Sequence, residues 1–188
     1  MARSSSSPDA GFSLLEVIVA AMLLATALVS LAQLFGVATR SNIGSRTTTY
    51  AAVLAQQKLE ELRSLSWGFD QVGLPISDIS TDTTVTPETP NGGTGLSPSP
   101  PNALQSNSPG WVDYIDAYGN KRGGGATAPD NTLYTRRWMV SPLPTNPNNT
   151  LVIQVLVFRN KARAAVDEGA RRFPEEARMV TVKTRKAR

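Results

Sequence analysis

The chain has 188 residues and contains neither cysteine nor histidine. Without cysteine there is no disulfide framework, thiolate nucleophile or thiolate metal site. Without histidine the commonest general base and metal ligand is missing. Catalysis by carboxylate, serine or lysine stays open, but the composition counts against an enzyme. We expect no catalytic residue, no metal and no cofactor.

The formal net charge of +4 is unevenly distributed along the chain. Residues 1–158 hold 9 Lys/Arg and 11 Asp/Glu, a balance of −2, and residues 159–188 hold 10 Lys/Arg and 4 Asp/Glu, a balance of +6. A basic end of this kind is typical of a solvated tail. A contact surface for anions or nucleic acid is the alternative.

The N-terminal part of the sequence changes abruptly from polar to apolar. Residues 1–11, MARSSSSPDAG, contain a proline and glycine that disfavour a helix. From Phe12 to Ala32 the sequence is apolar, and Glu16 is the sole charged residue in this run. As a helix the run would span about 31 Å, close to the roughly 30 Å hydrocarbon core of a bilayer. We therefore expect a membrane-spanning helix.

Glu16 is the most unusual residue of this helix. Insertion scales assign a charged residue at the centre of a membrane helix a cost of about 2.5–3.5 kcal/mol, so such residues are functional candidates. A cleavable secretory signal is disfavoured because its apolar core is usually about 7–15 residues long. A plain uncleaved anchor is also open, but it leaves Glu16 unexplained.

The segment GFSLLEVIVA resembles the processing site of type IV prepilins and type II secretion pseudopilins. The family pattern is a glycine, an apolar residue that is usually phenylalanine, then T/S-L-L/I-E at the start of a long apolar helix. Gly11, Phe12 and Glu16, with Ser-Leu-Leu between them, meet every position. The match spans about ten residues, but it joins a glycine, a charge and an apolar run in fixed register.

The resemblance implies how the chain would mature and assemble. A prepilin peptidase would cut between Gly11 and Phe12 on the cytoplasmic side and methylate the new amine of Phe12. Glu16 would pair with the Phe12 amine of a neighbouring subunit as the helix enters a filament. The partners would be the peptidase, other pilin or pseudopilin subunits and an assembly platform in the inner membrane. The protein would cross that membrane once, with its head in the periplasm or outside.

A second helical signal follows the apolar run. No proline occurs between residues 8 and 75, and YAAVLAQQKLEELRSLSW has amphipathic periodicity. Gly68 is expected to end the helix. The predicted apolar stripe comprises Tyr50, Val53, Leu54, Leu62 and Leu65. The predicted divisions are a leader at 1–11, a transmembrane or filament-core helix at 12–39, its amphipathic continuation at 40–67, a Pro/Ser/Gly-rich loop at 68–110 and a head at 111–188.

The head carries the strand signals. The predicted strands are Trp111–Tyr118, Leu133–Ser141, Leu151–Phe158 and Met179–Arg185. Because both faces of Leu151–Phe158 are largely apolar, this strand is expected to be central or covered on both sides. The predicted fold class is α+β, with a long N-terminal helix packed on a small antiparallel sheet, as in pilins. Residues 70–110 are expected to form a surface loop or a partly disordered insert.

Several polar residues of the head are candidates for binding. Arg136 and Arg137, beside Trp138, suit a nucleic-acid contact. The favoured alternative is an ordinary strand with Trp138 in the core and both arginines in solvent. Asp113 and Asp116 are considered as metal ligands but lack the spacing of an EF-hand. The segment GNKRGGG lacks the order of a phosphate loop and is expected to be a turn.

The expected function is that of a structural minor subunit of a type IV pilus. Many major pilins carry a helix-breaking proline at the position of Gln33, and the strand pattern is loosely similar to PilV-type minor pilins and I-type minor pseudopilins. A minor pseudopilin of a type II secretion system is the first alternative. An adhesive or DNA-binding minor pilin, using residues 70–110 or the basic C-terminus, is the second. An unrelated anchored enzyme has no catalytic constellation to support it.

Overall fold

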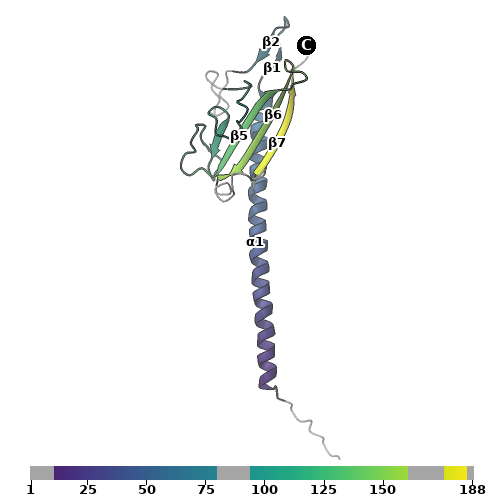
Figure 1. Cartoon of the computed structure of the whole chain (residues 1–188), viewed down its shortest axis with the longest axis vertical. Helices are drawn as coiled ribbons and strands as arrows, with labels where there is room; N and C mark the ends of the chain where they lie inside the picture. The colour runs from purple at the N-terminus through teal and green to yellow at the C-terminus, as the bar shows by residue number, and fades with distance from the viewer. Residues whose placement is uncertain (1–10, 80–93, 161–175, 186–188) are drawn as a thin grey trace, which may run out of the picture. The chain divides into compact units, whose positions relative to one another are not determined.

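The fold is α+β, as predicted. The computed structural model describes residues 11–79, 94–160 and 176–185. The chain divides into two compact units, residues 1–43 and 44–188. Helix α1 (Leu14–Ser64) contains the boundary between them, and the second unit holds the strands (Figure 1).

The part of α1 in the first unit is mostly apolar, and each described residue there is exposed. Two of its hydroxyl groups bond back to the helix backbone. Thr26 Oγ1 donates to the carbonyls of Met22 and Leu23, at 3.0 and 2.9 Å, and Ser30 Oγ donates to the carbonyl of Thr26 at 2.9 Å. This bonding satisfies the Thr26 and Ser30 hydroxyls without water, which suits an apolar surrounding.

The head, meaning the second unit, is built on one five-stranded antiparallel sheet with the strand order β4-β3-β5-β6-β7 (Figure 1). β6 lies between β5 and β7, which confirms the prediction of a central strand. The expected turn at GNKRGGG is partly wrong, because its middle residues form β4 and pair with β3. The strands are β3 (Val112–Ile115), β4 (Lys121–Gly123), β5 (Tyr134–Pro142), β6 (Thr150–Arg159) and β7 (Glu176–Thr184).

A separate hairpin of β1 (Trp67–Phe69) and β2 (Pro75–Ser77) follows the helix. Asp70 holds its turn, since Oδ1 accepts hydrogen bonds from the backbone N–H groups of Val72 and Leu74 at 3.0 and 2.7 Å. The sequence did not predict this hairpin. Strands of three residues are too short to show alternation.

The second half of α1 packs on one face of the sheet. Its buried positions are Ala51, Leu54, Ala55, Lys58, Leu59 and Leu62. They meet a sheet face that includes Trp138, Val140, Ile153, Val155 and Val157. The predicted stripe was wrong at Tyr50 and Val53, which are 37% and 56% exposed. Two alanines lie on the contact face instead, where small side chains permit close approach to the sheet.

The helix ends at Ser64, and the predicted stop at Gly68 was wrong because Gly68 lies in β1. Lys183 of β7 caps the helix end. Its Nζ donates to the backbone carbonyl of Leu65 at 2.6 Å and also to that of Arg63. A cation is favourable here because the last carbonyls of a helix lack partners within it.

Residues 94–110 form turns and irregular chain, as expected of a loop, but a few of their side chains anchor them to the sheet. Leu96 joins the main core, and Leu104 packs with Leu156 and Phe158 on the opposite face of the sheet. Residues 80–93 of the predicted loop lie outside the described residues, as do 1–10 of the predicted leader and 161–175 before β7.

Candidate functional site

The processing motif lies at the start of α1. Gly11 and Phe12 precede the helix, and Glu16 occupies its first turn. The backbone N–H groups of Glu16 and Val17 donate to the carbonyl of Ser13 at 3.0 and 3.2 Å. A carboxylate in the first turn complements the positive end of the helix dipole. The local fold therefore tolerates Glu16 well at this one end of an apolar helix.

Gly11 is not required by the fold of the described residues. A Cβ added at this position would meet no atom within 4 Å. Its backbone is also outside the positive-φ region in which glycine is favoured. The described fold therefore gives no reason for a glycine at this position.

The apolar side chains around the motif are not covered by any described residue of the first unit. Phe12 is 83% exposed, Leu14 80% and Met22 64%. Within the described residues, α1 is the one helix long and apolar enough to cross a membrane, judged by length and composition. A helix that is apolar all round needs lipid or other protein around it.

Arg136 is buried in the head, so the expectation of a solvent-exposed arginine was wrong. Its Nε and Nη2 donate to the Asp113 carboxylate at 2.8 and 2.6 Å. Its Nη1 donates to the backbone carbonyl of Leu54 at 3.1 Å and so ties the sheet to the helix. With 1% exposure, Arg136 offers no surface to a nucleic acid.

Arg137 points to the opposite face of the sheet, as expected for the next residue of a strand. Its Nη1 donates to the carbonyls of Leu104 and Gln105 at 3.0 and 2.6 Å. Nε and Nη2 donate to Asn107 Oδ1 at 2.9 and 2.6 Å. This side chain is 4% exposed, so it offers little surface to the nucleic acid considered as a possible partner, and the expectation that it lies in solvent was wrong. Its role is to hold residues 104–107 on the sheet.

Lys58 is a buried charge that the sequence interpretation missed. Its Nζ lies 3.1 Å from Glu61 Oε1, 3.8 Å from Asp113 Oδ2 and 4.2 Å from the centroid of the Trp138 ring. Burial lowers the pKa of Lys58 to about 8, although Asp113 and Glu61 oppose that shift. Its burial could have been inferred from its spacing, because Lys58 lies four residues from both Leu54 and Leu62 and so falls on the same buried face of the helix.

Asp113 and Asp116 have partners of their own. Asp116 Oδ1 accepts from the backbone N–H groups of Tyr118 and Asn120 at 2.8 and 2.9 Å, and Oδ2 pairs with Arg122 at 3.2 Å. The hydrogen bond from the Asn120 backbone is the main reason that the pKa of Asp116 lies below its usual value. Within the described ranges no three His, Cys, Asp or Glu residues are placed to hold a metal ion.

Comparisons of the chain with protein-family models, curated proteins and solved structures give no match. Two observations therefore carry the functional argument. One is the motif at the start of an apolar helix. The other is the α+β architecture, a long N-terminal helix packed on an antiparallel sheet, which is compatible with a pilin-like fold.

Proposed function

We propose that this chain is a structural subunit of a type IV pilin-like filament, and specifically a minor subunit of a type IV pilus. The observation that carries the proposal is Glu16 in the first turn of α1, four residues after Phe12 and inside the apolar run Phe12–Ala32. A minor pseudopilin would use the same segment in the same way.

The exposed apolar helix supports a membrane-inserted precursor. In the membrane its side chains would face lipid, and in a filament they would face the helices of other subunits. Both surroundings bury apolar surface at about 25 cal/mol per Å² removed from water. The same apolar helix surface would therefore hold the precursor in the bilayer and later contact neighbouring subunits in the filament.

Glu16 would fix the register of assembly. Cleavage after Gly11 would create a cationic amine on Phe12 at the end of the helix. In apolar surroundings, attraction between this amine and the Glu16 carboxylate of a neighbour is weakly screened. Leaving either charge without its partner is strongly unfavourable, so subunits that are out of register are rejected.

Processing provides the direct test. The full chain is produced in a host with and without a prepilin peptidase, and the N-terminus is identified by intact mass and peptide mass spectrometry. We expect a product that begins with N-methylated Phe12 only when the peptidase is present. Gly11→Val should accumulate as the uncleaved precursor.

Gly36→Val is the matched control, because a Cβ at Gly36 also meets nothing within 4 Å. This variant should be cleaved normally. Normal cleavage of Gly11→Val, or an unprocessed wild-type chain in the presence of the peptidase, would refute the proposal. A pilus is distinguished from a secretion pseudopilus by which filament contains the processed chain.

A further inference from the structure

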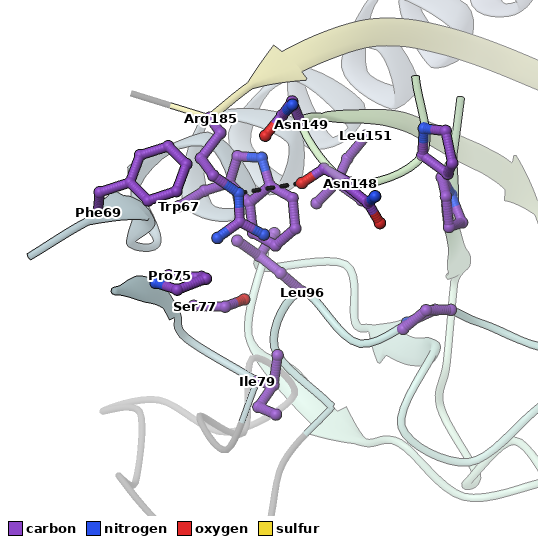
Figure 2. A pocket seen from close by; sticks show the side chains of 13 residues that line it. Trp67, Phe69, Pro75, Ser77, Ile79, Leu96, Asn148, Asn149, Leu151 and Arg185 are labelled. Carbon is purple, nitrogen blue, oxygen red and sulfur yellow. Dashed lines mark hydrogen bonds between the residues drawn. The ribbon is translucent and has the colours of Figure 1, made fainter. Parts of the chain in front are cut away.

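An open pocket of about 470 Å³ lies in the head, between the β1–β2 hairpin, the turn from β5 to β6 and the end of β7 (Figure 2). Apolar side chains form most of its wall, among them Trp67, Phe69, Leu96 and Leu151. Small-molecule sites are concave, mostly apolar and about 300–1,000 Å³ in volume. The pocket meets these criteria.

Arg185 is the one charged side chain among the described residues that line the pocket. Its guanidinium carbon lies 3.9 Å from the centroid of the Trp67 ring and 5.3 Å from that of Phe69. Its Nε donates to the carbonyl of Asn148 at 3.0 Å, and Nη1 donates to that of Gly68 at 3.2 Å. These contacts hold the guanidinium in place. Binding a ligand would therefore cost little additional side-chain entropy.

The guanidinium keeps donors for a ligand. Arginine has five N–H groups, and the described residues supply Arg185 with two side-chain hydrogen bonds and no ion pair. In Figure 2 its terminal nitrogens point away from Asn148, toward the side of the pocket that Pro75 and Ser77 line. The two oxygens of a carboxylate fit such a fork of N–H groups.

We propose that this pocket binds a carboxylate attached to an apolar body, such as the last residue of a peptide or an acidic side chain between apolar ones. One guanidinium balances one negative charge, and no lysine among the described lining residues would neutralise a second. The apolar body would pack on Phe69, Ile79 and Leu96. This activity is separate from filament assembly.

The test uses the full chain in lipid nanodiscs, with empty nanodiscs subtracted. N-acetylphenylalanine and its amide differ only in the carboxylate, and each is titrated by isothermal calorimetry. We expect the acid to bind about tenfold to a hundredfold more tightly, the usual range for a hydrogen bond to a charged group. A second pair, acetyl-Phe-Glu-Phe-amide and its Gln counterpart, presents the carboxylate on a side chain. If the first pair shows the preference for the acid, the ligand is a terminal carboxylate. If the second pair shows it, the ligand is an acidic side chain.

Arg185→Gln should remove the preference for the acid. Arg178→Gln is the matched control, because Arg178 is an exposed arginine of β7, the strand that directly precedes Arg185, and does not line the pocket. Equal binding of acid and amide by the wild-type chain in both pairs would overturn the proposal, as would an undiminished preference in Arg185→Gln. The wild-type comparison does not depend on how the variants fold.

Discussion

Asp113 and Arg136 face each other directly across β3 and β5 and form an ion pair with two hydrogen bonds inside the head, at 2.8 and 2.6 Å. Arg136 is 1% exposed and Asp113 is fully buried. Since Arg136 also bonds to the backbone of Leu54, this pair links the central part of the sheet to α1.

Removing one partner of this pair should strongly destabilise the head. For Arg136→Met we expect a loss of about 3–5 kcal/mol, because the Asp113 carboxylate stays buried without its main partner. Urea unfolding of the full chain in detergent micelles, followed by tryptophan fluorescence, measures this loss. All three tryptophans lie in the head, at positions 67, 111 and 138, so the signal reports the head alone.

The exposed pair Arg63–Glu60 provides the control for that experiment. Its atoms lie 3.0 Å apart, with side chains 51% and 56% exposed. Arg63→Met should change stability by about 1 kcal/mol or less, as is usual for surface pairs. Similar losses for the two variants would show that Asp113 and Arg136 do not form the stabilising link that we infer.

Lys58 should make the head more stable as the pH rises from about 8 to about 10.5. Its pKa is lowered from 10.5 to about 8 by burial. In that interval the unfolded chain keeps a proton that the folded chain has released, so stability increases with pH. The full shift corresponds to roughly 3 kcal/mol. Urea unfolding of the full chain at several pH values, compared with Lys58→Met, isolates this contribution.

Lys121→Met is the control for the pH experiment. Lys121 contacts the same Glu61 carboxylate at 3.4 Å, but its side chain is 18% exposed. This variant should keep the alkaline gain in stability, and Lys58→Met should lose it. A gain that survives in Lys58→Met would assign the pH effect to another group.

Much of the architecture followed from sequence patterns. The helix, the central position of β6 and the main strands were predicted because apolar residues recur there with helical or strand periodicity over many residues. The α+β class followed from these elements. The hairpin β1–β2 could not be predicted, because three-residue strands depend on a turn and on tertiary packing.

The burial of charged residues could not be predicted in the same way. Arginine and lysine are expected at the surface from their residue type alone, since they are rarely buried unless paired. Arg136 and Arg137 are buried because partners distant in sequence satisfy them, and a single sequence does not show those pairings. Lys58 has one near partner, Glu61, but its other partner, Asp113, is also distant in sequence. Residues 94–110 were likewise predicted to lie in a surface loop, although Leu96 and Leu104 anchor them to the two faces of the sheet.

Glu16→Gln should separate maturation from assembly. Because the change leaves Gly11 and Phe12 in place, we expect normal cleavage. Incorporation into sheared filaments should fall about tenfold or more, because the neighbour's Phe12 amine would lose its counter-charge in apolar surroundings. Quantitative mass spectrometry of the filament fraction measures this ratio. Glu60→Gln, at an exposed position of the same helix, should assemble normally; equal incorporation of both variants would contradict the role of Glu16.

Arg137→Gln should loosen residues 104–107 and leave the ion pair of Arg136 intact. The guanidinium bonds to two backbone carbonyls and to Asn107, and hydrogen bonds to charged groups contribute about 1.5–3 kcal/mol each. Hydrogen–deuterium exchange of the full chain should show faster exchange at Gln105 and Ser106, whose N–H groups bond to Asn102. The exposed Arg178→Gln should leave that exchange unchanged. Unchanged protection in Arg137→Gln would mean that Leu104, packed on Leu156 and Phe158, holds the segment alone.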